Sequence, residues 1–329
     1  EYTMGKKEAI IIDYLSQPEV FAALFNGYVF GGKQIIQSED LRETDGRLRF
    51  LLTDIESKDK KSTYEVIERE RDIVREVIIG EQTVCLTILG VEHQSEIDYS
   101  MVLRTLTYDT LEYLKQAKAI EREHKRKKDV KGREFLSCFK KDDILLPTIT
   151  IVFYTGKEKW DAARDLKGLF GTSPYLEQML PFMVTSPLNL ISIYDVEDPT
   201  RYHGSLRKVF ELLRYTEDKN AMTKYLDDHA EVYSKLDEAT ARLLALLLDL
   251  QLSDKEVRTR EGGLDMCKAL EDMKKEAEEK GEERGEEKGI TKIIVSMLDK
   301  DMTCEEIAAL TDVPLEQIKR IAETEQAAG

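Results

Sequence analysis

The stretch TVCLTILGVEHQSEIDYSMVLR, residues 83–104, decides the fold class of this chain. Its first part, Thr83–Glu92, is a nearly unbroken run of apolar and β-branched side chains, which predicts a central strand covered on both faces of a sheet. From Ile97 onward, the apolar residues follow the period of a helix instead. These helical positions are Met101, Leu103, Leu106, Leu111 and Leu114. A strand that leads directly into a helix is typical of α/β layers.

Short β-branched segments and amphipathic segments on either side extend this pattern. Strands are expected at residues 47–56, 63–79, 146–156 and 189–196, and helices at residues 205–218 and 238–252. A first helix is expected after Ser16, because Ser16 and Glu19 have the spacing of a capping box and Pro18 is tolerated in a first helical turn. Together these elements predict an α/β layer structure.

The composition argues against several classes of protein. The longest apolar run, Leu243–Leu248, is far shorter than the ~20 residues that span a bilayer. No signal peptide is recognised, so we expect a cytoplasmic protein with no membrane partner. The four cysteines lack CxxC spacing and the four histidines form no HExxH motif, which argues against a zinc site.

The charge is unevenly distributed along the chain, whose net charge is −16. By itself this charge disfavours a nucleic-acid partner, because phosphates repel an acidic surface. Residues 264–329 carry a net charge of −8, whereas residues 115–133 hold nine basic and three acidic side chains. This basic segment is either a phosphate-binding surface or a solvated helix end. Its candidate DNA contacts are Lys125, Arg126, Lys127 and Lys128.

Glu92 and Gln94 end the predicted central strand and, being two residues apart, face the same side of it. A carboxylate there is unfavourable to bury unless it is paired or binds a cation. If residues 81–83 form a three-residue turn, the antiparallel register sets Asp72 opposite Glu92, with Cβ atoms about 5 Å apart. A divalent cation would relieve their repulsion, and oxygen ligands favour Mg²⁺ or Mn²⁺. In the alternative, Asp72 is one charge on a solvated strand and is balanced by Arg69, Arg71 and Arg75.

Three segments carry a family resemblance: RERD at 69–72, GVEHQSEIDYSMVLRTLTYD at 90–109 and VFYTGKEKW at 152–160. In this order they resemble the transposase-like recombination-promoting nucleases of the PD-(D/E)XK superfamily. The resemblance extends over most of the chain. It implies an α/β fold: a PD-(D/E)XK restriction-endonuclease-like core, which is a mixed sheet flanked by helices, followed by a helical C-terminal tail. In that core Asp72, Glu92 and Gln94 are catalytic and the two carboxylates bind Mg²⁺ or Mn²⁺. It also implies a role in the recombination of mobile DNA or in defence against phage.

Gln94 departs from the commonest superfamily pattern, which has a lysine at this position. A neutral amide can orient a water molecule but supplies no positive charge. Transition-state stabilisation would then fall to the metal and to Arg104, whose alternative role is a surface ion pair. The resemblance also makes Glu19 a candidate accessory residue, although its place in a capping box already explains it. Residues 157–160 either touch a phosphate or cap the core.

Four segments are expected along the chain. We predict the nuclease-like core at residues 8–200, a helical extension packed on it at 201–262, a charged connecting helix at 263–290 and a small helix-turn-helix-like module at 291–325. Within the module, Thr303 and Glu306 have the spacing of a second capping box. We call residues 263–329 the C-terminal helical tail.

Two functions follow from these patterns. The first is Mg²⁺-dependent endonucleolytic hydrolysis of DNA phosphodiester bonds. The alternative is a nuclease-fold DNA-binding or regulatory protein in which catalysis has lapsed, which the acidic composition and Gln94 favour. We also expect a homo-oligomer such as a dimer, with the C-terminal helical tail as its interface. Other roles for the tail are autoinhibition of the basic segment or targeting to DNA.

Overall fold

The computed structural model describes two compact units, Glu1–Asp265 and Met266–Gly329. The described residues are 4–44, 47–53, 64–70, 72–80, 82–89, 97–250, 289–298, 300, 302–311 and 313–328. Within these residues, no helix is both long enough and apolar enough to cross a membrane. The finer division of the first unit into a core and a helical extension stays a prediction.

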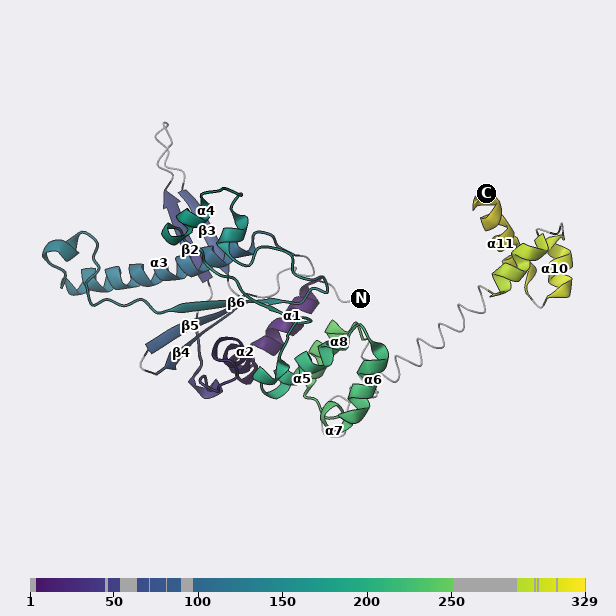
Figure 1. The fold of residues 1–329 in the computed structure, drawn as a ribbon, viewed down its shortest axis with the longest axis horizontal. Coiled ribbons are helices and arrows are strands. Elements are labelled where there is room, and N and C mark those ends of the chain that lie inside the picture. The colour runs from purple at the N-terminus through teal and green to yellow at the C-terminus, as the bar shows by residue number, and fades with distance from the viewer. Residues whose placement is uncertain are drawn as a thin grey trace, which may run out of the picture. The chain divides into compact units, whose positions relative to one another are not determined.

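A five-stranded mixed sheet forms the centre of the first unit (Figure 1). Its order is β1 (Arg42–Glu43), β4 (Ile73–Ile79), β5 (Gln82–Leu89), β6 (Thr148–Tyr154) and β7 (Asn189–Ser192). β4 pairs antiparallel with β1 and β5, whereas β6 pairs parallel with β5 and β7. The strand predicted from the first quoted stretch is thus the middle strand of the sheet, and the mixed α/β class is confirmed.

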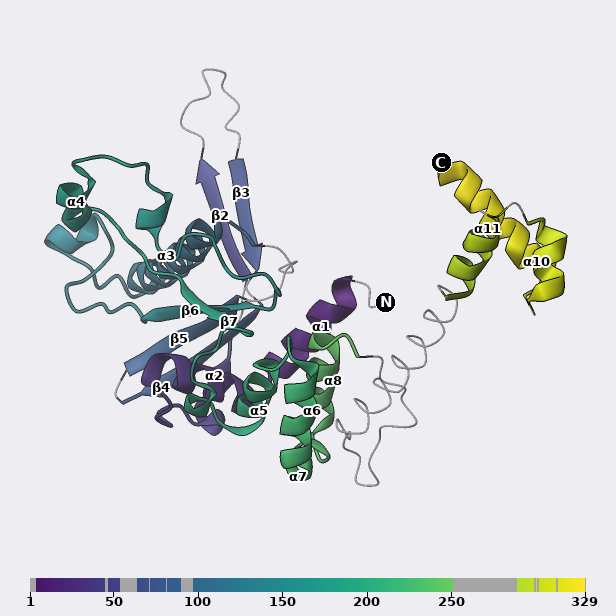
Figure 2. The same ribbon diagram turned by 45° about the vertical axis from the view of Figure 1, so that its right-hand side comes forward.

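Helices cover this sheet on two sides (Figures 1 and 2). One side is covered by α3, whose Tyr108 and Leu111 join a buried cluster with Val152 and Tyr154 of β6. On the other side lie α2 and α5. The α-helices of this unit are α1 (Met4–Leu15), α2 (Pro18–Phe30), α3 (Met101–Lys127), α4 (Leu176–Met179), α5 (Gly204–Leu213), α6 (Lys219–Asp228), α7 (Ala230–Tyr233) and α8 (Glu238–Leu247). Short 3₁₀ turns are η1 (Ser38–Asp40), η2 (Gly132–Phe135), η3 (Leu166–Leu169), η4 (Leu180–Phe182) and η5 (Pro199–Arg201).

The first helix begins earlier than predicted. α1 precedes Ser16, and the Ser16 amide donates 2.8 Å to the carbonyl of Ile12, so Ser16 belongs to the end of α1. The N-cap of α2 is Gln17, which makes no side-chain capping bond. The predicted capping box of Ser16 and Glu19 was therefore wrong, because Ser16 completes one helix instead of starting the next.

The long strand predicted at residues 63–79 is two strands in two different sheets. β3 (Tyr64–Glu70) pairs antiparallel with β2 (Arg47–Thr53), whereas β4 pairs with β1 and β5. Figure 2 shows the β2–β3 pair pointing away from the central sheet. The apolar pattern continues through both strands, but β3 pairs with β2 whereas β4 pairs with β1 and β5. A local sequence pattern does not show which strand a segment will pair with, so the change of partner between Glu70 and Ile73 was not predicted.

The helix predicted from Ile97 onward is confirmed as α3, but its buried stripe is only partly the predicted one. Met101 and Tyr108 are buried, together with the polar Thr105, whose hydroxyl donates to the Met101 carbonyl. Leu103 and Leu114 are instead 48% and 43% exposed. Helical geometry puts positions 101, 105 and 108 on one face and position 103 about 160° away from 105. The position of a residue around the helix therefore decides whether it is buried, even where its side chain is polar, as in Thr105, or apolar, as in Leu103.

The second unit contains a three-helix module with its own apolar centre. Its helices are residues 289–298, α10 (Cys304–Leu310) and α11 (Leu315–Ala328). Ile294, Ile307 and Ile318, one from each helix, are fully buried against one another. The capping box of Thr303 and Glu306 is confirmed, since each side chain bonds the other residue's backbone amide. The connecting helix predicted at 263–290 lies almost entirely outside the described residues.

Candidate active site

The β4–β5 hairpin determines where the predicted catalytic residues can meet. Its register pairs Ile79 with Gln82 and Ile73 with Ile88, so two residues connect the paired strands and the first of them is Gly80. Gly80 has φ +64°, the left-handed conformation that two-residue hairpin turns require at their first position. The predicted three-residue turn was therefore wrong, and with it the direct pairing of Asp72 and Glu92.

Continuing the observed register by one pair sets Asp72 opposite Leu89, the last residue of β5. Asp72 is half-buried and immediately precedes β4. Glu92 and Gln94, as well as their neighbour His93, lie outside the described residues. The hairpin thus keeps Asp72 and the end of β5 at one end of the central sheet, and the catalytic roles of the three residues stay predictions.

The junction of α1 and α2 is tied to this end of the sheet by Arg75. The Arg75 Nη2 donates to the carbonyl of Ser16 at 2.6 Å and pairs with Glu43 Oε1 at 3.1 Å. Its guanidinium lies 5.5 Å from the centre of the Phe21 ring on α2. Arg75 is itself buried, so α2 is held against β4 three residues after Asp72.

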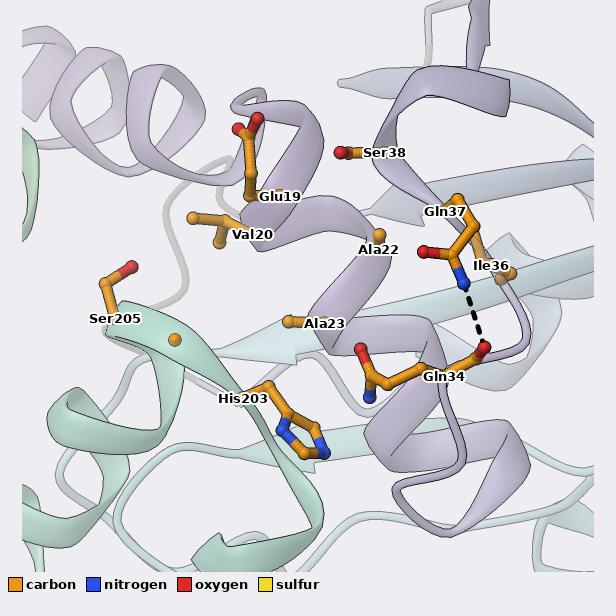
Figure 3. Close-up of a pocket in the computed structure, with 11 residues that line it drawn as sticks. Glu19, Val20, Ala22, Ala23, Gln34, Ile36, Gln37, Ser38, His203 and Ser205 are labelled. Carbon is orange, nitrogen blue, oxygen red and sulfur yellow. Dashed lines mark hydrogen bonds between the residues drawn. The ribbon is translucent and has the colours of Figure 1, made fainter.

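Glu19 lies in the first turn of α2, is exposed, and lines a cavity of about 240 Å³ (Figure 3). The opposite wall is a loop held on α2 by Asn26, whose amide bonds the backbone of Ile35 and Ile36. Gln37 within that loop donates 3.0 Å to the Gln34 carbonyl. The polar lining residues are Glu19, Gln34, Gln37, Ser38, His203 and Ser205. Without a capping bond, Glu19 remains an accessory candidate.

Arg104 is held by an ion pair at the start of α3. Its Nη1 lies 2.9 Å from Asp98 Oδ2, while Asp98 Oδ1 accepts from the backbone and hydroxyl of Ser100. Partial burial would raise the pKa of Asp98, but the bonds from Ser100 and Arg104 outweigh it and lower that pKa. This geometry matches the ion-pair alternative for Arg104.

Residues 157–160 include one side chain that packs in the core, Trp160, and one that forms a surface ion pair, Lys157. Trp160 is buried, meets Tyr154 edge-on at 5.1 Å and donates 3.1 Å to the Ala162 carbonyl. Lys157 instead pairs with Asp249 at 2.6 Å. The tryptophan therefore caps the core, which was one of the two predicted roles.

The predicted DNA-contact residues 125–128 are all exposed on the last turn of α3 and its cap. Lys127 pairs with Glu123 at 2.5 Å, and Lys125 pairs with Glu121, each one helical turn earlier. Within the described part of the chain, Arg126 and Lys128 form no ion pair. Exposed pairs of this kind contribute little energy, so all four cations can be offered to a phosphate.

Residues 71–243 match the family described as "Putative transposase, YhgA-like". The match extends over more than half of the 329 residues. The chain belongs to the YhgA-like transposase family. No curated protein and no solved structure matches it.

The part shared with the YhgA-like family begins one residue before Asp72 and ends within α8. It includes the three residues predicted to be catalytic and the whole of α3 with its basic end. Glu19 lies outside it. The family match therefore includes the β4–β5 hairpin and α3. It does not include α2, so the proposed role of Glu19 has no support from the family match.

Two well-placed polar residues of this YhgA-like chain were missed by the sequence analysis. Arg75 was expected only to balance surface charge. It lies two residues from both Ile73 and Val77, so its side chain shares their apolar face of β4. This two-residue spacing could have predicted from the sequence that Arg75 is buried. His124, which is bonded to both Asp129 and Asp143, had no such signal, because the loop that returns Asp143 to it is irregular.

Proposed function

We propose that this YhgA-like protein is a Mg²⁺-dependent DNA endonuclease with a PD-(D/E)XK core. One observation chiefly supports the proposal: the β4–β5 register sets Asp72 beside the end of β5, and Glu92 and Gln94 follow that end by three and five residues. The family description as a transposase supports DNA as the substrate.

Asp72 and Glu92 would hold the metal in this proposal. Carboxylate oxygens are the ligands that Mg²⁺ and Mn²⁺ prefer, and Glu19 is a candidate third carboxylate. When bound, the cation supplies Lewis-acid activation of a water nucleophile. Among the described residues, no group of three or more His, Cys, Asp or Glu side chains is assembled into a metal site. The proposed set depends on Glu92, which is outside those residues.

Gln94 and the basic end of α3 would act on the substrate. The Gln94 amide can accept from a water and donate to a phosphate oxygen at the same time. Arg104 is already engaged by Asp98, so the cations that offset phosphate charge come from residues 125–128 instead. In this proposal, the affinity for DNA depends on the basic end of α3, and hydrolysis depends on the residues at the end of the β4–β5 hairpin.

Plasmid nicking tests the proposal, because a closed circle has no ends and reports only endonucleolytic cleavage. Supercoiled plasmid is incubated with the full-length protein and Mg²⁺, with or without EDTA. We expect conversion to open circles that stops with EDTA and is lost in Asp72→Asn. Asp227→Asn on α6 is the matched control, since Asp227 is an exposed aspartate far along the chain.

A different result would support the second function, a nuclease-fold DNA-binding or regulatory protein. The net charge of −16 and the ion pair that occupies Arg104 favour this alternative. Parent protein that binds the plasmid without nicking it in Mg²⁺ or Mn²⁺ would establish it. Nicking that is equal in the parent and Asp72→Asn would instead remove the proposed site.

A further inference from the structure

The end of α3 and the loop that follows it form a projecting tip, residues 124–144 (Figure 1). The tip holds eight Lys or Arg and four Asp or Glu, a net charge of +4 in a chain of net charge −16. Its charge is therefore opposite in sign to that of the molecule. A local reversal of this kind favours a polyanionic partner.

Two carboxylates of the tip, Asp129 and Asp143, are bonded to His124 and Lys140. We call these four residues the clasp. The two ring nitrogens of His124 lie 2.8 Å from Asp129 Oδ1 and 2.9 Å from Asp143 Oδ2. Lys140 donates from Nζ to Asp129 at 2.7 Å and from its amide to Asp143 at 2.6 Å. Two of the four acidic groups are thus satisfied inside the tip, and the cations dominate its outer surface.

The tip also exposes apolar side chains. Phe135 is 67% exposed and Leu136 is 94% exposed. They enter a tight turn in which Cys138 is buried, has φ +50° and donates from Sγ to the Phe135 carbonyl at 3.6 Å. The tip therefore carries an exposed aromatic ring, Phe135, in addition to the exposed cations of residues 125–128.

This combination matches the chemistry of single-stranded nucleic acid. Cations bind the phosphates of such a strand, and aromatic rings stack on its unpaired bases. In a duplex the base faces are covered by their neighbours, so an exposed ring gains much less. An acidic peptide would use the cations but leave Phe135 and Leu136 in water.

We propose that the tip binds single-stranded DNA, with Phe135 stacked on an unpaired base and residues 125–128 on the adjacent phosphates. The inference rests on the DNA substrate of the proposed function and does not depend on the metal site. It assigns to the tip the recognition of an unpaired segment, and it leaves hydrolysis to the hairpin.

Binding of the full-length protein to a fluorescent single strand and to a duplex of equal length, in EDTA, tests the inference. Phe135→Ala should weaken single-strand binding about tenfold, near the lower end of the effect of one stacked base. The dependence on salt should not change, because no phosphate contact is lost. Phe182→Ala is the matched control, since Phe182 is 90% exposed on a different segment.

The cations give an independent readout. Lys127→Gln should reduce the slope of log affinity against log salt by about 0.7, the value for one phosphate contact of a single strand. Lys224→Gln, an exposed lysine of α6, should leave the slope unchanged. Thermal unfolding of each variant checks that the surface change leaves the fold intact.

Several outcomes would overturn the inference. These are equal affinity of Phe135→Ala and the parent, preference of the parent for the duplex, or binding to anionic phosphatidylserine vesicles without binding to the single strand. Cleavage measured separately in Mg²⁺ distinguishes the two proposals. A parent that nicks plasmid while tip variants bind normally refutes the tip alone, and tip-dependent binding without cleavage refutes the nuclease alone.

Discussion

Arg75 of β4 donates a 2.6 Å hydrogen bond to the backbone carbonyl of Ser16, at the junction of α1 and α2. The bond connects two segments that are 59 residues apart in the chain. Because β4 begins one residue after Asp72 and α2 carries Glu19 in its first turn, this contact sets how close the two candidate carboxylates can come.

Replacing Arg75 tests that contact. Arg75→Met keeps most of the volume but leaves the Ser16 carbonyl without its donor, which should reduce the free energy of unfolding by about 1–3 kcal/mol. Glu43→Gln is the control, since its carboxylate is 81% exposed and an exposed ion pair contributes at most about 1 kcal/mol. Urea unfolding measures both variants. Equal stability of the two variants would mean that the ion pair, rather than the bond to Ser16, is the significant contact.

Glu92 should affect the metal requirement of cleavage. Glu92→Gln removes a charged ligand, so the Mg²⁺ concentration that gives half-maximal plasmid nicking should rise at least about tenfold, or nicking should disappear. Glu76→Gln, within the same hairpin, should leave the requirement unchanged. A normal Mg²⁺ titration of Glu92→Gln would exclude Glu92 as a ligand.

Gln94 should tolerate lysine better than leucine. Lysine is the commoner residue at this position in the PD-(D/E)XK superfamily, which this chain resembles. A lysine can also donate to a phosphate, so Gln94→Lys should retain measurable nicking. Gln94→Leu has no donor or acceptor and should reduce the rate to the level seen with EDTA. Initial nicking rates under identical Mg²⁺ compare the variants. If Gln94→Leu is as active as the parent, the amide takes no part in the reaction.

The tip should loosen at both ends of the pH range. Bonds to Asp143 and Asp129 raise the pKa of His124, so its contribution is complete below about 6.5 and is lost as the pH rises through the raised value. The bonds from Lys140 and His124 lower the pKa of Asp129 to about 2, so the contribution of Asp129 is present above about 4 and is lost as the pH falls toward 2. NMR titration of the His124 ring and hydrogen exchange of the tip amides measure this window.

Asp143→Asn provides the control for the tip. It removes the largest cause of the raised His124 pKa, so the ring should titrate closer to 6.5 and the alkaline loosening should begin earlier. A His124 titration that is identical in Asp143→Asn and the parent would contradict the clasp.

Removal of the second unit should strengthen DNA binding. A chain that ends at Asp265 keeps the first compact unit whole and removes most of the net charge of −8 carried by residues 264–329. If this acidic segment competes with DNA for the basic end of α3, the truncated protein should bind single strands more tightly and less selectively. Weaker binding would favour a targeting role for the module, and a change in mass by light scattering would reveal an oligomerisation role.

Local patterns in the sequence were sufficient to predict much of the fold. The apolar run before Glu92 predicted the middle strand, the change of period after Ile97 predicted α3, and Thr303 with Glu306 predicted the start of α10. Each of these features depends on residues within a few positions of one another, where backbone geometry and side-chain spacing are directly linked.

Tertiary structure alone decided how the segments meet. The two-residue turn at Gly80 changed the register, the exchange of partners after Glu70 divided one predicted strand into two, and Ser16 ended α1 instead of capping α2. Each outcome depends on hydrogen bonds or packing between distant segments, and neighbouring residues carry little information about these. For the same reason the family resemblance could nominate Asp72, Glu92 and Gln94 from the sequence, whereas the clasp around His124 became visible only once the loop to Asp143 had folded back.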